Sequence, residues 1–148
     1  MSVSKPGRSR GRNRTRVLVV SHDAIVRAEI QRTLRAQGLD VTAVGDAFEA
    51  LAALARLNGS AASIRIAIVD TYLPGFSGWD LLRYLRISLP GTPLLRLEVA
   101  GTDVPLEFAT LDVSVLTKPV RPSGLLSAMR RLLTSPGEWH RGEQAQRG

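Results

Sequence analysis

The sequence predicts an α/β fold in which one parallel sheet is covered by helices on both faces. Short apolar runs rich in β-branched residues, typical of strands buried on both faces, alternate with longer stretches that have helical spacing. This alternation occurs five times along the 148 residues, without an internal repeat. Regular alternation of strands and helices is typical of parallel sheets joined by right-handed crossovers.

The first strand is predicted at Val17–Val20, a continuous apolar run. Asp23 follows in a position to cap a helix that extends to Gln37, because its side chain can accept hydrogen bonds from the first free amides. The apolar residues of this helix have i, i+4 and i+8 spacing, and they are Val26, Ile30 and Leu34. Gly38 suits the position just after a helix end.

The second and third strands are predicted at residues 39–44 and 64–70, and both are mostly apolar. Between them lies an Ala- and Leu-rich helix that Asp46 could cap and that extends to Leu57. Asn58-Gly59 then ends the helix.

The second half of the chain continues the pattern. A helix is predicted from Ser77 to about Ser88, a strand at 93–99, a strand at 113–117 and a last helix at 122–133. Residues 101–110 have the weakest pattern, which indicates a short loop with one or two helical turns.

This connectivity predicts a flavodoxin-like (βα)5 three-layer sandwich with strand order 2-1-3-4-5. Ligands of such sheets bind beyond the carboxyl ends of the strands, at the switch point between strands 1 and 3. We therefore expect Ser21, His22 and Asp23 on one wall of a crevice and Asp70 on the other. Lys118, at the end of the fifth strand, should lie on the same rim.

Composition limits the class of protein. Apolar residues make up 44% of the chain, which is normal for a soluble domain, and the absence of cysteine excludes disulfides and thiolate metal sites. No apolar run is long enough to cross a membrane. A cytoplasmic location without membrane contact is the expectation.

The net charge of +7 is concentrated near the start, where residues 1–16 contain six Lys or Arg and no acid. We expect residues 1–15 to be a disordered basic tail, 16–134 one domain, and 135–148 a polar tail that includes Trp139 and His140. The basic tail could be an arm that binds nucleic acid or an acidic membrane surface, or it could be a solubilising leader or the product of a mis-assigned start codon. The arginines have no aromatic residues between them on which bases could stack, which favours the leader.

The segment Ile66–Asp80 contains the main functional motif. A buried strand ends on a single carboxylate, Asp70, and Pro74, Gly75 and Gly78 then form a loop before the next helix. This segment resembles the phosphoacceptor strand and loop of response-regulator receiver domains in two-component signalling. Leu116-Thr117-Lys118-Pro119 likewise resembles the end of their fifth strand. The resemblance covers about residues 16–134.

The resemblance implies that Asp70 is the phosphoacceptor and Lys118 its charge partner. Receiver domains hold Mg²⁺ with two carboxylates after strand 1, but Ser21 and His22 occupy those positions here, and Asp23 comes one residue later. Mg²⁺ prefers oxygen ligands in octahedral geometry. With only Asp70 and the backbone carbonyl of Tyr72 as ligands, Mg²⁺ binding should be weak.

Two positions that change conformation on activation in this family are also substituted. The hydroxyl residue of strand 4 corresponds to Glu98, and the aromatic residue of strand 5 to Val115. A carboxylate beside a phosphoryl group would repel it. Glu98 could therefore turn inward to pair with Lys118, or it could face solvent.

Three functions remain open on this basis. The first is a stand-alone response regulator in a phosphorelay, phosphorylated on Asp70 by a sensor histidine kinase with impaired Mg²⁺ chemistry. The second is a phosphorylation-independent pseudo-receiver that binds other signalling proteins. The third, which the tail composition disfavours, is a nucleic-acid-associated protein. None is an enzyme, and the resemblance implies output or homodimer formation through the face of helix 4, strand 5 and helix 5, where Arg121, Arg130 and Arg131 would be exposed.

Overall fold

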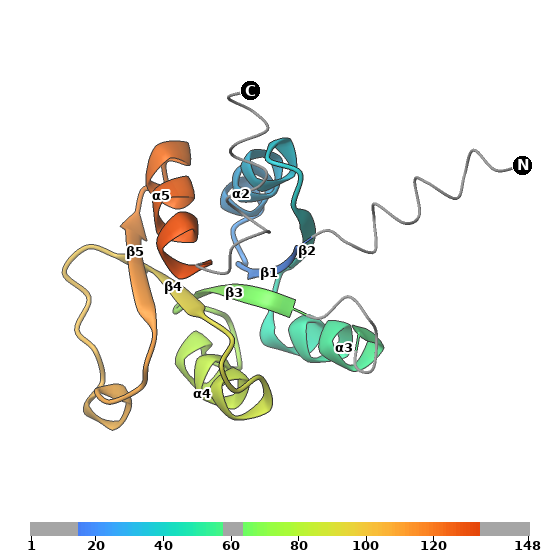
Figure 1. The fold of residues 1–148 in the computed structure, drawn as a ribbon. Helices are drawn as coiled ribbons and strands as arrows, with labels where there is room; N and C mark the ends of the chain where they lie inside the picture. Colours follow the sequence, from blue (N-terminus) through green and yellow to red (C-terminus); the bar gives the residue numbers. More distant parts are fainter. Residues whose placement is uncertain (1–14, 58–63, 134–148) are drawn as a thin grey trace, which may run out of the picture.

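The computed structural model describes residues 15–57 and 64–133. Of the two predicted tails, only Thr15 lies inside this range. The predicted helix end at Asn58-Gly59 lies outside it. Five parallel strands form one sheet with the order β2-β1-β3-β4-β5, which confirms the predicted fold class (Figure 1). The strands are β1 (Arg16–Val20), β2 (Asp40–Val44), β3 (Ile64–Asp70), β4 (Leu94–Val99) and β5 (Ser114–Lys118).

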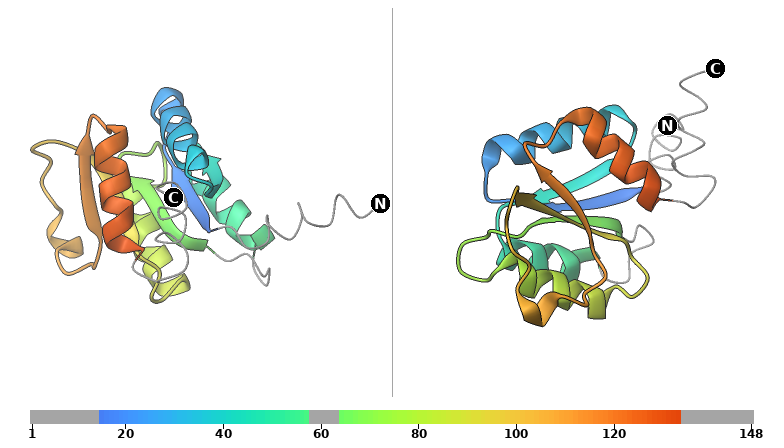
Figure 2. Two further views of the ribbon diagram at one scale, coloured as in Figure 1. Left: turned by 45° about the horizontal axis from the view of Figure 1, so that its top comes forward. Right: turned by 90° about the vertical axis from the view of Figure 1, so that its left-hand side faces the viewer.

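Four α-helices cover the two faces of the sheet in the described residues. They are α2 (Ala24–Ala36), α3 (Ala47–Leu57), α4 (Gly78–Ser88) and α5 (Pro122–Leu132). Helices α2 and α5 pack on one face, and α3 and α4 on the other, which gives the three layers visible in Figure 2. None of these helices is long and apolar enough to cross a membrane.

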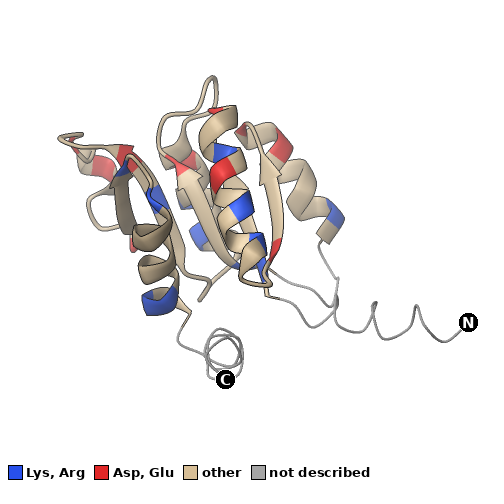
Figure 3. Cartoon of the chain, turned by 90° about the horizontal axis from the view of Figure 1, so that it is seen from above, with Lys and Arg blue, Asp and Glu red and all other residues tan. Residues whose placement is uncertain are grey.

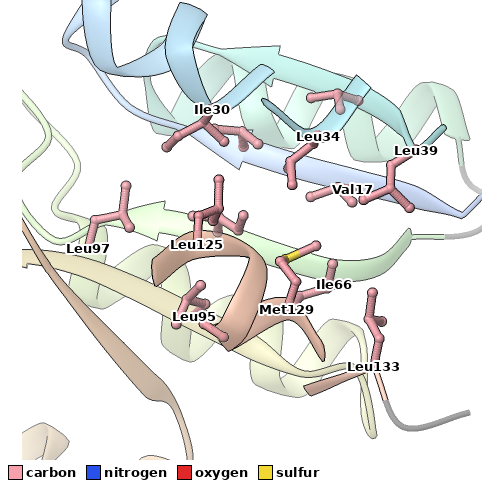
Figure 4. Packing of buried hydrophobic residues seen from close by; sticks show 14 residues of the cluster. Val17, Ile30, Leu34, Leu39, Ile66, Leu95, Leu97, Leu125, Met129 and Leu133 are labelled. Carbon is pink, nitrogen blue, oxygen red and sulfur yellow. The ribbon is translucent and has the colours of Figure 1, made fainter. Parts of the chain in front are cut away.

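The strand pattern explains why there are two cores. In β1 the buried side chains alternate, with Val17 and Val19 in the core beneath α2 and α5, and Leu18 and Val20 in the core beneath α3 and α4. Figure 4 shows the first core, where Ile30 and Leu34 of α2 approach Leu125 and Met129 of α5 above the sheet. A parallel strand that is apolar on both sides is required for this arrangement.

The helix starts are set by local side-chain caps. Asp23 Oδ1 accepts hydrogen bonds from the amides of Ile25 (2.9 Å) and Val26 (3.2 Å), as predicted. At α3, Asp46 Oδ1 accepts from the Glu49 amide (2.8 Å), and Glu49 Oε1 accepts from the Gly45 amide (2.6 Å). These two reciprocal bonds resemble a capping box and satisfy amides that the helix itself leaves free.

The fourth crossover differs from the expected (βα)5 pattern. Between β4 and β5 the structure has a single 3₁₀ turn, η1 (Leu106–Phe108), in place of an α-helix. Pro105 precedes this turn, and Phe108 is the one buried residue among 100–110. Without further inward-facing apolar side chains, this segment cannot form the buried stripe that stabilises a surface helix.

The basic residues proposed for an interaction face are exposed, as expected. Arg121 is the N-cap residue of α5, and Arg130 and Arg131 lie in its last turn. Figure 3 shows this last turn of α5 in blue. The helix expected beside them on that face is absent from the described residues, because η1 replaces it.

Candidate functional site

The carboxyl-end edge of the sheet brings together residues from three strands. Asp70 is the last residue of β3, Lys118 is the last residue of β5, and Ser21 directly follows β1. Lys118 Nζ donates a hydrogen bond to Asp70 Oδ2 at 2.7 Å, and Ser21 Oγ donates to the same oxygen at 3.3 Å. The strand order therefore brings these three residues together at one edge of the sheet, as the sequence predicted.

The Asp70 carboxylate is buried and fully engaged. Its side chain is 1% exposed, against 22% for Lys118. The Tyr72 amide donates to Oδ1 at 3.1 Å, so both carboxylate oxygens accept hydrogen bonds. A buried carboxylate needs such partners, because burial of an unpaired charge is costly.

Ser21 belongs to the site as a buried hydroxyl, while His22 lies at its exposed rim. The Ser21 hydroxyl also accepts from the Asp23 amide (3.3 Å), and its carbonyl accepts from Arg27 (2.6 Å). The His22 ring makes an edge contact with the Tyr72 ring at 5.3 Å between centroids. The described contacts of Tyr72 are made by its amide and its ring, and none involves its carbonyl.

Glu98 takes neither of the two orientations considered from the sequence. Its Oε1 pairs with Arg96 Nε at 2.8 Å, and the two side chains are 11% and 13% exposed. Arg96 and Glu98 are two residues apart on β4, so their side chains lie on the same face of the sheet and can contact each other. The pairing of Glu98 with Lys118 was therefore a wrong alternative, because Lys118 is bound to Asp70.

An aromatic stack, missed by the sequence reasoning, supports the Arg96–Glu98 pair. The Arg96 guanidinium lies 5.0 Å from the centroid of the Trp79 ring. Trp79 stacks on Phe108 of η1 with centroids 5.3 Å apart and a ring angle of 14°. Arg83 lies over Phe108 at 4.8 Å. The stack ties β4, α4 and η1 together, and aromatic residues far apart in sequence give no signal of such contacts.

Three further features complete the description of the predicted site residues. Gly78 begins α4 where a side chain would clash, because an added Cβ would lie 2.7 Å from Thr71 Cα and closer still to the Asp70 carbonyl. The Lys118–Pro119 peptide bond is cis. Val115, at the position of the expected aromatic residue, is 41% exposed on β5. Gly78 therefore lets the helix approach the strand that carries Asp70.

The residues present do not fit a Mg²⁺ site. No group of three or more His, Cys, Asp or Glu that could hold a metal occurs in the described residues. Ser21 and His22 stand where carboxylates would be needed, and the Asp70 oxygens already accept bonds from Lys118, Ser21 and Tyr72. Mg²⁺ prefers carboxylate oxygens, so this donor set is poor.

Comparison with known sequences identifies the family. The family model of the response regulator receiver domain matches residues 17–130. The chain belongs to the response regulator receiver domain family. Asp70 and Lys118 therefore lie at the sheet edge of a receiver domain of two-component signalling.

Several relatives are named as DNA-binding or transcriptional regulators. The chain is 31% identical over 122 residues to the DNA-binding response regulator MtrA of Mycobacterium tuberculosis, which covers 81% of this chain and 51% of that protein. It is 34% identical over 121 residues to the transcriptional regulatory protein AruR of Pseudomonas aeruginosa, which covers 80% and 49%. The receiver chain thus spans about half the length of the curated relatives it matches.

Solved structures agree with the fold. The chemotaxis protein CheY4 of Vibrio cholerae has a TM-score of 0.69 at 27% identity, and the match covers 81% of this chain and 99% of that chain. The receiver domain from the hybrid histidine kinase CckA has a TM-score of 0.65 at 28% identity, with coverage of 80% and 98%. Both are structures of proteins to which this receiver is similar.

Proposed function

We propose that this receiver domain signals through protein contacts and that its Asp70 pocket has lost Mg²⁺-dependent phosphoryl transfer. The main observation behind this proposal is that the Asp70 carboxylate is buried and accepts hydrogen bonds from Lys118, Ser21 and the Tyr72 amide. A phosphoryl group would add negative charge to a pocket in which Asp70 and Lys118 already neutralise each other. Without a divalent cation, that added charge would have little compensation.

The Arg96–Glu98 pair supports the same proposal. A receiver that responds to phosphorylation needs a donor on β4 for a phosphoryl oxygen, and Glu98 has no proton to donate when ionised. Its pairing with Arg96 and the stack on Trp79 hold β4 in one arrangement. We therefore infer a phosphorylation-independent pseudo-receiver, cytoplasmic and without enzymatic activity, whose partner is a histidine kinase or another signalling protein.

A second candidate function is phosphorylation of Asp70 with impaired chemistry. The 2.7 Å contact from Lys118 favours it, because this cation could pair with a phosphoryl group on the neighbouring carboxylate. The similarity to response regulators also supports it. In that case a sensor histidine kinase would be the phosphodonor.

One titration separates the two candidates. Mg²⁺ and beryllofluoride, a phosphoryl mimic, are added to a Trp139→Phe background in which Trp79 fluorescence reports on the loop after Asp70. We expect a flat response at millimolar Mg²⁺. A saturable response that is lost in Asp70→Asn would instead establish the second candidate.

A gain-of-function variant serves as the matched control. Ser21→Asp combined with His22→Asp restores the acidic pair after β1, and it should acquire a Mg²⁺-dependent response that Asp70→Asn removes. Circular dichroism must first show that this variant is folded. A response from the restored variant alone would show that the loss lies in the metal ligands.

A further inference from the structure

A groove lies between α2 and the segment that joins β5 to α5. Its volume is about 340 Å³, within the range of clefts that take a small organic group. Figure 2 (right) shows the two helices, α2 in blue and α5 in orange-red, side by side above the sheet. The groove is distinct from the Asp70 pocket, although Pro119 in its wall directly follows Lys118. Its apolar lining also includes Ile30, Val120, Pro122 and Leu125.

Three charged side chains surround this apolar lining. Glu29 and Arg32 are exposed on α2, and Arg121 is exposed at the start of α5. No hydrogen bond or ion pair joins these three side chains to any residue of 15–57 or 64–133. An apolar centre with a charged rim is typical of a surface that binds another protein segment. The lining suits a large apolar side chain with an acid and a base near it in sequence.

The chain itself contains a segment of this kind. Trp139 follows Glu138 directly and precedes Arg141 by two positions. The other ranges outside the described residues, 1–14 and 58–63, contain no aromatic residue. A tryptophan has a large apolar area to bury and an N–H that can stay at a polar rim. Residues 134–148 are therefore the part of the chain whose chemistry matches the groove.

The connection is long enough for this contact. Leu133 is the C-cap residue of α5, and Leu125 in the groove lies about 12 Å back along the helix at 1.5 Å per residue. Trp139 is the sixth residue after Leu133, and an extended chain of that length spans about 20 Å. Pro136-Gly137 lies between them and favours a turn, so the chain can reverse its direction.

We propose that residues 134–141 fold back along α5 and place the Trp139 ring in this groove. Helices α2 and α5 both begin at the carboxyl edge of the sheet, so a segment that returns along α5 passes Arg32 before Glu29. The segment has its acid, Glu138, before its base, Arg141, so each meets a residue of opposite charge. A short linker gives an effective concentration on the order of millimolar, so even a weak contact is occupied.

The docked segment regulates access to one face of the receiver. It covers α2 and the connection that follows Lys118, so a signalling protein that binds there must first displace Trp139. The inference goes beyond the proposed function, and the docking does not depend on whether Asp70 binds Mg²⁺ or accepts a phosphoryl group.

Fluorescence of Trp139 tests the docking in the full chain. In a Trp79→Phe background Trp139 is the one remaining tryptophan, and the phenylalanine keeps an aromatic ring beside Phe108. Circular dichroism checks that this variant is folded. We expect emission at a shorter wavelength, and acrylamide quenching roughly threefold weaker, than in a free peptide of residues 134–148. Quenching equal to that of the free peptide would overturn the docking.

Charge reversal tests the order of the contacts. Glu29→Lys should raise the quenching of Trp139 towards the peptide value, because the groove then presents a like charge to Arg141. Adding Arg141→Glu should restore the protection. Ala28→Lys, exposed on α2 but outside the groove, is the matched control and should change nothing. If the second reversal restored no protection, the proposed pairing of Glu29 with Arg141 would be wrong.

A disulfide test keeps both tryptophans, since the chain has no cysteine of its own. Thr33→Cys in the groove and His140→Cys beside Trp139 should form an intramolecular disulfide, which migrates faster in non-reducing gels. The control pairs His140→Cys with Ile87→Cys, at an exposed position of α4. A free tail can reach that position too, because the neighbouring Arg86 lines a pocket together with Leu132.

The two cysteine pairs give three distinguishable results. We expect the Thr33 pair to close at least tenfold faster than the Ile87 pair. Equal rates would mean a tail without a preferred site, and disulfide-linked dimers in place of the intramolecular product would mean that a second copy fills the groove. Either result would overturn the proposal. The proposed loss of Mg²⁺ chemistry would still stand, because none of these measurements uses Mg²⁺ or a phosphoryl mimic.

Discussion

The Asp70–Lys118 pair makes a clear prediction at the scale of single residues. Lys118→Met leaves a buried carboxylate without its cation, while the bonds from Ser21 and Tyr72 remain. Removing one member of a buried pair costs about 3–5 kcal/mol, and we expect about 3 kcal/mol here because Lys118 is partly exposed. Urea unfolding of the full chain measures this free-energy difference.

Two further variants show that the effect comes from charge burial. Lys118→Met combined with Asp70→Asn removes both charges and should recover part of the lost stability. Arg83→Gln, which breaks the exposed ion pair with Asp80 and the contact with the Phe108 ring, should cost no more than about 1–2 kcal/mol. If Lys118→Met were no worse than Arg83→Gln, the pair could not be a structural element of the pocket.

At the scale of elements, the 3₁₀ turn η1 is held mainly by one side chain. Phe108 is buried against Trp79, whereas most residues of the connection between β4 and β5 are exposed. Phe108→Ala removes the stack, so the connection should open locally before the molecule unfolds. We expect amide hydrogen exchange in residues 100–113 to accelerate at least tenfold, with the amides of β1 and β3 still protected.

Leu106→Ala is the matched control in the same turn. Its side chain is 91% exposed, so stability should change by less than about 0.5 kcal/mol and exchange should stay near that of the parent chain. Faster exchange throughout the sheet in Phe108→Ala would contradict a local role for η1.

The element scale also shows what the sequence could predict. The strands and α2 were predictable, because the continuous apolar runs and the spacing of Ile30 and Leu34 are direct signals of burial. The meeting of Asp70 and Lys118 was also predictable, because parallel strands present their carboxyl ends at one edge. The partner of Glu98 was not predictable. Alternation places Arg96 on the same face as Glu98, but the sequence does not indicate that Trp79 packs against the Arg96 guanidinium.

At the scale of the whole molecule, the two cores should unfold together. Strands β1 and β3 contribute alternate side chains to both, so neither face can lose its packing without disturbing the shared sheet. Leu34→Ala on the buried side of α2 and Leu82→Ala on the buried side of α4 each remove a fully buried side chain. Each should lower the free energy of unfolding by about 2–5 kcal/mol.

Two probes decide whether this cooperativity holds. In a Trp139→Phe background, Trp79 fluorescence reports on the α4 face and far-ultraviolet circular dichroism on all elements. Leu34→Ala lies on the opposite face from Trp79, yet both probes should move to the same lower midpoint, because a two-state domain unfolds in one transition. Ile87→Ala, exposed on α4, should leave both midpoints nearly unchanged. If the midpoint of the Trp79 transition in Leu34→Ala stayed at the parent value while the dichroism midpoint fell, the two faces would unfold separately. The shared strands would then not couple the Asp70 edge to α2.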